Sequence, residues 1–215
     1  MHLILEDFLK ILPELEKHID LAGGNGFNEP ILSFDEITFN GRTKCGHEEH
    51  DLGITWPSEN AGGVAVPYQE NAADGSWFAG ATLQKRMCDG DCSHETFYFP
   101  RIQPSDSYTI DKISYIDKDG NPVYNDPAIV GLYFDFCKTA FKPYDLAVIT
   151  ILIIAKRHLK DFIFVSSDGQ DSHWFDGKMF CQVSLGYGLD FFIDSTTGYL
   201  TRKEVGVHEK AKGSN

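Results

Sequence analysis

A stretch of ten nearly uninterrupted apolar residues constrains this chain more than any other feature of its sequence. Residues 146–155 read Leu-Ala-Val-Ile-Thr-Ile-Leu-Ile-Ile-Ala. Pro143 and Asp145 precede the stretch and a basic cluster follows it at 156–160, an order of residues that favours a helix. Because a helix that is apolar all round has no face for water, it must lie inside the fold. We therefore predict a helix over 143–160 as the hub of the structure.

Length and composition agree with an ordinary globular protein. A chain of 215 residues, 42% apolar and 24% charged, can bury roughly 70% of its unfolded surface. The apolar stretch of ten residues is shorter than the roughly 20 that cross a bilayer. The N-terminal segment 1–11 is interrupted by charges and lacks the features of a signal peptide. The sequence predicts a soluble cytoplasmic protein with no membrane partner.

The N-terminal half, residues 1–125, predicts a helix followed by antiparallel hairpins. Apolar residues recur at helical spacing, then in short runs that are separated by Gly, Asn and Asp. The expected elements are a helix over 3–21, a strand over 31–39, a hairpin of 77–87 with 96–102 across the turn at 88–92, and a hairpin over 108–124 around an Asp-Gly turn.

The C-terminal half, residues 126–200, predicts strands and helices in alternation. Strands are expected over 130–136, 162–165 and 189–193, with helices over 143–160 and 174–183. Right-handed crossovers would connect these strands if they are parallel. With no repeat or linker between the halves, the prediction is one α+β domain over 1–215 with a single core around the buried central helix. Residues 201–215 are expected to form a flexible tail.

Cysteine and histidine in two loops indicate a metal site. The five cysteines are an odd number for a disulfide framework, so reduced thiols or metal ligands are favoured. Thiolate and imidazole are the donors of tetrahedral zinc sites. The expected ligands are Cys45, His47, Cys88 and Cys92, with His50 and His94 as alternates. The alternative is two polar loops with unligated thiols.

A second set of polar residues follows the predicted strands of the C-terminal half. Lys138, Ser167 and Asp168 would meet at one edge of a parallel sheet, where ligands of open α/β folds bind. These residues are the catalytic candidates, although helix caps and turns require the same residue types. Cys137, beside Lys138, could be a nucleophile with His158 or His173 as its base, or a buried core cysteine.

The net charge of −13 bears on the choice of partner. Nucleic-acid binding draws its affinity from Lys and Arg, so direct binding is disfavoured. The preferred hypothesis is a non-enzymatic accessory protein that acts through protein contacts, with a structural zinc ion. The first alternative is a small-molecule hydrolase that uses the strand-end cluster or an open zinc site. The second is an acidic mimic of DNA that occupies a DNA-binding protein.

Overall fold

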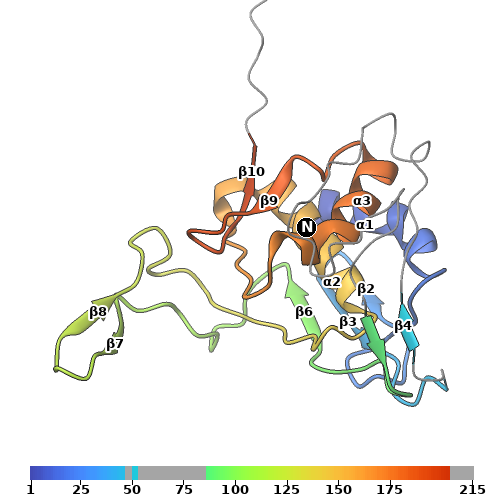
Figure 1. Cartoon of the computed structure of the whole chain (residues 1–215), viewed down its shortest axis with the longest axis horizontal. Coiled ribbons are helices and arrows are strands. Elements are labelled where there is room, and N and C mark those ends of the chain that lie inside the picture. The colour runs from blue at the N-terminus through green and yellow to red at the C-terminus, as the bar shows by residue number, and fades with distance from the viewer. Residues whose placement is uncertain (47–49, 53–85, 204–215) are drawn as a thin grey trace, which may run out of the picture.

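Three helices form the centre of the molecule. The computed structural model describes residues 1–46, 50–52 and 86–203, and Figure 1 shows its elements. Helix α2 (Asp145–Leu159) packs against both α1 (His2–Leu15) and α3 (Phe175–Leu185). The predicted hub is confirmed, because α2 is buried on every side of its first two turns and at Ile153, Ile154 and Ala155.

Local sequence explains how these helices end and how closely they approach. Gly177 lies where α3 crosses α2, and a Cβ there would lie 2.3 Å from Cγ2 of Ile149. A larger residue at this crossing would force either the Ile149 side chain or one of the helices to move. Gly186 ends α3 in the left-handed region, with φ of 78°. Helix α1 contains Pro13 in its last turn and ends two residues later.

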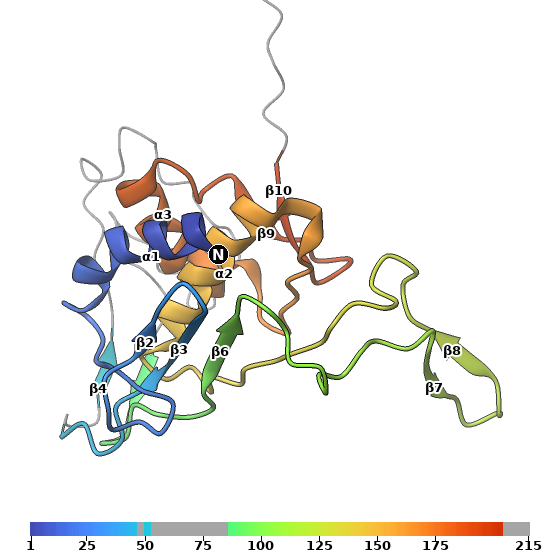
Figure 2. The same cartoon turned by 180° about the vertical axis from the view of Figure 1, so that it is seen from behind.

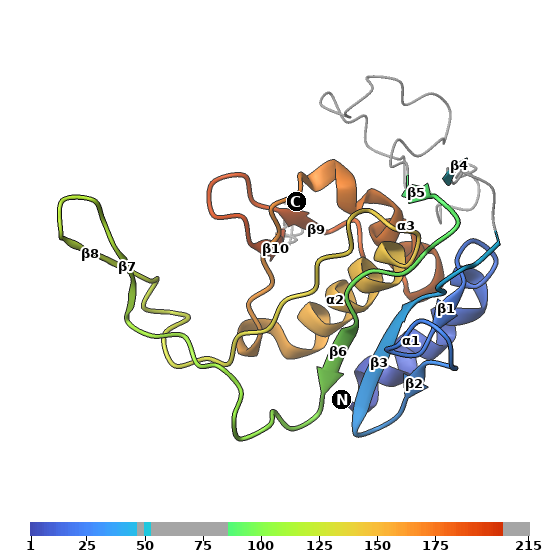
Figure 3. The ribbon, with the colours of Figure 1, turned by 90° about the horizontal axis from the view of Figure 1, so that it is seen from below.

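A small antiparallel sheet lies beside the helices. Its central strand β3 (Glu36–Gly41) pairs with β1 (Leu21–Ala22), β2 (Ile31–Leu32) and β6 (Phe97–Pro100). Phe39 of β3 stacks on Phe8 of α1 at a centroid distance of 5.9 Å and touches Phe97 of β6 at 4.9 Å. One cluster of buried side chains thus joins the sheet to the helices, and Figure 3 shows β3 and β6 alongside α1 and α2.

Among the described residues, three further strand pairs lie outside this sheet, and each is antiparallel. β4 (His50–Leu52) pairs with β5 (Arg86–Cys88), β7 (Ile113–Ile116) with β8 (Pro122–Tyr124), and β9 (Phe191–Ile193) with β10 (Leu200–Arg202). Two 3₁₀ turns, η2 (Lys160–Phe162) and η3 (Asp171–Trp174), flank the end of α2 and the start of α3. No helix among the described residues is long and apolar enough to cross a membrane.

The mixed α+β class is confirmed, while several predicted elements are wrong. Residues 130–136 and 162–165 form no strands; Tyr133 and Ser166 make single antiparallel bridges to Thr109 and Tyr199. The described part of the chain has no parallel strand pair. Short apolar runs are ambiguous because an exposed aromatic segment and a buried strand have the same composition.

Pairing across 88–92 also differs from the prediction. The two flanking strands do not form a hairpin, because β5 pairs with β4 and β6 with β3. Residues 77–85 of the strand expected over 77–87 lie outside the described residues. At the C-terminus, Thr201 and Arg202 belong to β10 instead of a tail, and 204–215 lie outside the described residues. The hairpin over 108–124 is confirmed as β7 and β8.

Asp7 of α1 ties the three helices together. Its carboxylate accepts hydrogen bonds from Nε2 of His158 in α2 at 2.7 Å and from the hydroxyl of Tyr187, after α3, at 3.0 Å. Burial raises the pKa of Asp7, but the hydrogen bonds from His158, Lys10 and Tyr187 outweigh burial and hold that pKa below its ordinary value. The ionised form therefore stabilises the fold.

We expect Asp7→Asn to lower the free energy of unfolding by about 1–2 kcal/mol at neutral pH, since hydrogen bonds to a charged acceptor are lost. A carboxylate with a lowered pKa stabilises fully above its ordinary pKa of 3.8, and that stability is lost as the pH falls through the lower folded-state pKa. The difference in Tm between the unchanged protein and Asp7→Asn should therefore narrow as the pH falls from 3.8 through the folded-state pKa. Melting followed by circular dichroism would measure this difference.

Glu6→Gln is the matched control on the same helix. The ion pair of Glu6 with His2 is exposed, so loss of this pair should change the free energy of unfolding by less than about 1 kcal/mol. A Tm difference for Asp7→Asn that stays constant into acid would show that the ionised carboxylate is not the stabilising group.

Candidate metal centre

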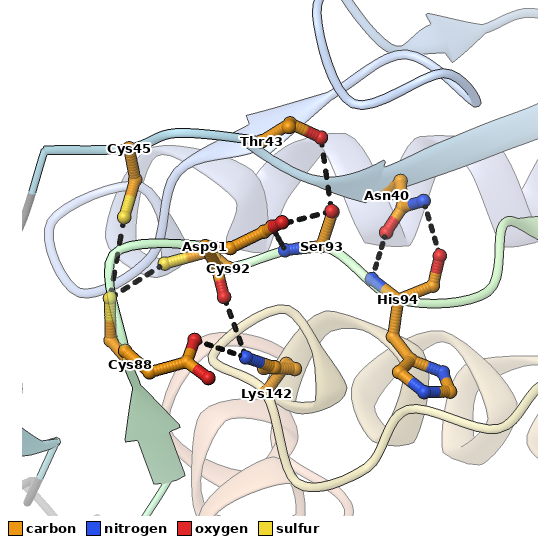
Figure 4. Close-up of polar contacts among 10 residues, drawn as sticks. Asn40, Thr43, Cys45, Cys88, Asp91, Cys92, Ser93, His94 and Lys142 are labelled. Carbon is orange, nitrogen blue, oxygen red and sulfur yellow. Dashed lines mark hydrogen bonds and ion pairs between the residues drawn. The ribbon is translucent and has the colours of Figure 1, made fainter.

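Three cysteines from two distant loops meet at one point. Sγ of Cys88 lies 3.3 Å from Sγ of Cys45 and 3.3 Å from Sγ of Cys92, and the three sulfurs all lie within 4.8 Å of one another. Figure 4 shows them at one end of the contact between the loops. None of the five cysteines, all of them described, is in a disulfide.

Backbone and side-chain hydrogen bonds hold the two loops in this register. The segment 40–45 begins with the last two residues of β3, and 88–94 leads from the end of β5 towards β6. The amide of Asn40 donates to the carbonyl of His94 at 2.9 Å, and its oxygen accepts from the backbone N–H of His94 at 3.0 Å. The hydroxyl of Thr43 donates to that of Ser93 at 3.0 Å. The cysteines are thus positioned by a polar contact that does not itself require a metal (Figure 4).

Lys142 connects this contact to the central helix. Its ammonium donates to a carboxylate oxygen of Asp89 and, at 2.7 Å, to the carbonyl of Asp91. Lys142 lies three residues before the start of α2. The turn between Cys88 and Cys92 is therefore fixed against both β3 and the hub.

The cluster has the chemistry of a soft-metal site. Tetrahedral zinc with Zn–S bonds of about 2.3 Å separates its sulfurs by about 3.8 Å. Two of the three pairs of sulfurs lie at 3.3 Å, so a small outward movement of the thiols would accommodate the ion. Cys88 and Cys92 are buried and Cys45 is partly buried. Burial raises the pKa of the Cys92 thiol, and the neighbouring Cys88 and Cys45 raise it further. A bound cation would reverse this effect, since zinc takes its cysteine ligands as thiolates.

The histidines expected beside these cysteines have different places. His47 lies outside the described residues. The backbone of His50 pairs with that of Cys88 in the β4–β5 ladder. Figure 4 shows His94 away from the sulfurs. Its Nδ1 lies 2.7 Å from the carbonyl oxygen of Lys138. The expected alternate His94 is therefore not part of the cysteine cluster.

The catalytic candidates Lys138, Ser167 and Asp168 lie in loops instead of at the ends of parallel strands. Lys138 is exposed, with its Nζ 5.4 Å from the ring centre of Phe136. Ser167 accepts a hydrogen bond from the backbone N–H of Gly169 at 3.0 Å, as a turn residue does. No hydrogen bond or ion pair links Lys138 to Ser167 or Asp168 in the described part of the chain. The topology that would bring them together is absent there.

Cys137 lacks the lowered thiol pKa of an activated nucleophile. Burial raises the pKa of its thiol to about 11, although a hydrogen bond with Tyr144 opposes this shift. His158, one of the two expected bases, is hydrogen-bonded to Asp7. The other, His173, accepts from the backbone N–H of Gln170. The interpretation as a core cysteine fits these observations.

Sequence reasoning missed a buried ion cluster next to the cysteines. The guanidinium of Arg86 is fully buried and donates to Asp176 at 2.7 Å, while its Nε lies 3.6 Å from Asp145. Burial raises the pKa of Asp145, and Arg86 and a hydrogen bond from Thr139 oppose the shift. The available signal was an arginine inside the strand predicted over 77–87, with acidic residues in the first turns of two helices.

Comparisons with known proteins give no relative: no family model, no curated protein and no solved structure matches the chain. The site must therefore be interpreted from its own chemistry.

Proposed function

We propose that this chain is a non-enzymatic accessory protein that acts through contacts with other proteins and is held in shape by a structural zinc ion. The observation that carries the proposal is the cluster of Cys45, Cys88 and Cys92. Catalytic zinc sites keep a position open for water, whereas structural sites are closed by four protein ligands. Burial of Cys88 and Cys92 favours the structural type.

The ion would add a link between two segments that hydrogen bonds already hold side by side. Cys45 follows the central strand, while Cys88 and Cys92 flank a turn that Lys142 holds against the start of α2. Three thiolates leave one position of a tetrahedron, and His47 or its alternate His50 is proposed to fill it. Five cysteines without a disulfide fit the reducing cytoplasm, which remains the proposed location.

Metal analysis tests the proposal on protein purified under reducing conditions without added zinc. We expect about one zinc per chain by mass spectrometry, and a fall in Tm when a strong chelator removes it. Cys88→Ser should abolish zinc binding, because Cys88 lies between the other two sulfurs. His47→Ala and His50→Ala together should weaken it, while His94→Ala should leave it unchanged.

Cys137→Ser is the matched control, since this cysteine lies outside the cluster and is also partly buried. It should keep the zinc and its affinity. A protein that takes up no zinc on titration and melts at the same temperature in chelator would end the proposal. The same cysteines would then be interpreted as core thiols.

The alternative functions, a small-molecule hydrolase and an acidic mimic of DNA, have less support. A hydrolase at the strand ends lacks the parallel strands on which that idea depends, in the part of the chain that the structure describes. A hydrolase at an open zinc site would need an exposed ligand position next to Cys88 and Cys92, and both are buried. The acidic DNA mimic stays a prediction from net charge alone.

A further inference from the structure

Residues 102–136, here called the arm, leave the body of the molecule as a long two-stranded ribbon. β7 and β8 pair at its far end, with Tyr115 opposite Val123. Nearer the body, the N–H of Ile110 donates to the carbonyl of Leu132, and that of Phe134 to Tyr108, each at 2.9 Å. Figures 1 and 2 show the ribbon projecting away from the helices, and Figure 3 shows the same from below.

The arm exposes apolar side chains that a folded protein normally covers. It carries ten of the nineteen large apolar residues that are exposed in the described part of the chain, including Tyr115 and Ile116 at 59% and Tyr124 at 58%. All four residues of β7 are exposed, so both faces of the ribbon are open. A two-stranded ribbon is at best marginally stable in water, and contiguous exposed apolar surface marks an interaction site.

The arm is also acidic. It contains six aspartates and two lysines, for a net charge of −4. At its tip the backbone N–H of Asn121 and that of Asp119 donate to Asp117, which lowers the pKa of this carboxylate and keeps it ionised. A second copy of the chain, with its charge of −13, an anionic lipid surface and a nucleic acid are all repelled by this charge.

We propose that the arm binds an extended, basic and apolar segment of a partner protein, which adds to the ribbon as a third strand. The inference rests on the proposed function, because it names the surface through which the accessory protein acts. Addition of a strand supplies backbone hydrogen bonds to an open edge, and the aromatic side chains on either face give specificity. Tyrosine and phenylalanine are enriched at such interfaces, and the aspartates select a basic segment.

Three sets of synthetic peptides with equal apolar content, carrying basic, neutral or acidic residues, test the inference against the full-length protein by fluorescence anisotropy. Basic peptides should bind at least about tenfold more tightly than neutral ones and weaken with added salt. Tyr115→Ser with Ile116→Ser should cost about tenfold or more in affinity. Asp111→Lys with Asp119→Lys should remove the preference for basic peptides, because the two changes bring the net charge of the arm from −4 to 0.

Phe162→Ser is the control, since Phe162 is 90% exposed but lies in η2, outside the arm. It should bind as the unchanged protein does. Zinc content and melting are measured on every variant, so loss of the arm's binding with zinc retained separates this inference from the proposed function. Equal binding of all three peptide sets, or none, would overturn it. So would sedimentation showing a dimer that Tyr115→Ser dissociates, or preferential binding to anionic lipid vesicles.

Discussion

Replacing Arg86 with methionine is expected to lower the free energy of unfolding by about 3–5 kcal/mol, the usual cost of removing one partner from a buried ion pair. The side chains of Arg86 and Asp176 are both fully buried and are joined at 2.7 Å. Asp145, at the start of α2, lies within 3.6 Å of the same guanidinium. Without the cation, two carboxylates would share a buried site at the starts of α2 and α3.

The size of this effect should depend on pH. Burial raises the pKa of Asp145, and Arg86 opposes that shift, so Arg86→Met should raise the pKa further. A carboxyl with a raised pKa stabilises fully below its ordinary value of 3.8, and that stability is lost as the pH rises through the folded-state pKa. The penalty of Arg86→Met, measured by urea unfolding, should therefore be larger at neutral pH than in mild acid.

The double variant Arg86→Met with Asp176→Leu separates the ion pair from simple packing. Replacing both charges of a buried pair by apolar groups of similar volume is often neutral, so the double variant should recover the part of the loss that comes from Asp176, while Asp145 stays without its cation. A single variant that loses less than about 1 kcal/mol would contradict the role assigned to Arg86. So would a double variant whose loss equals the sum of the two single losses.

The hub and one hairpin could be predicted because local sequence decides them. Residues 146–155 leave no face for water, whatever the rest of the chain does, and α2 covers this stretch. The Asp-Gly step at 119–120 likewise specifies the turn between β7 and β8, where Gly120 has φ of 85°. In both cases the residues that make the element also carry the signal.

Long-range pairing could not be predicted in the same way. β5 and β6 flank a turn, as the sequence indicates, yet each pairs with a strand from residues 36–52. The composition of 130–136 is that of a buried strand, whereas Tyr133, Phe134 and Phe136 lie exposed on the arm. Exposure of aromatic residues is a property of the whole surface, so no local pattern distinguishes it from burial.

The candidate metal centre could be predicted from the sequence only in part. Donor types and spacing within 88–92 predict that two thiols can share an ion, and Cys45 joins them across 43 positions of sequence. What the sequence does not show is the contact between Asn40 and His94, which brings the loops together and turns His94 away from the sulfurs. The same contact includes a close backbone approach between Gly41 and Cys92.

Alanine at Gly41 is expected to displace Cys92 and to weaken zinc binding. A Cβ on Gly41 would lie 1.8 Å from the carbonyl oxygen of Cys92, so one of the two loops must move. Backbone bonding leaves little room for that movement, because the N–H of Cys92 donates to the carbonyl of Arg42 at 3.1 Å. We expect a loss of about 1–3 kcal/mol in the free energy of unfolding and at least about a tenfold loss of zinc affinity.

Competition against a coloured chelator and urea unfolding would measure the two losses. Gly120→Ala is the control: it has a positive φ and open space around it, so it should cost about 1–2 kcal/mol without changing zinc affinity. Unchanged zinc affinity in Gly41→Ala would show that the cysteines do not depend on this approach. Equal zinc loss in both variants would show that the metal follows overall stability. If Gly41→Ala loses zinc and Gly120→Ala retains it, Cys92 is a ligand of the ion, because Cys92 is the residue that the added methyl group would displace.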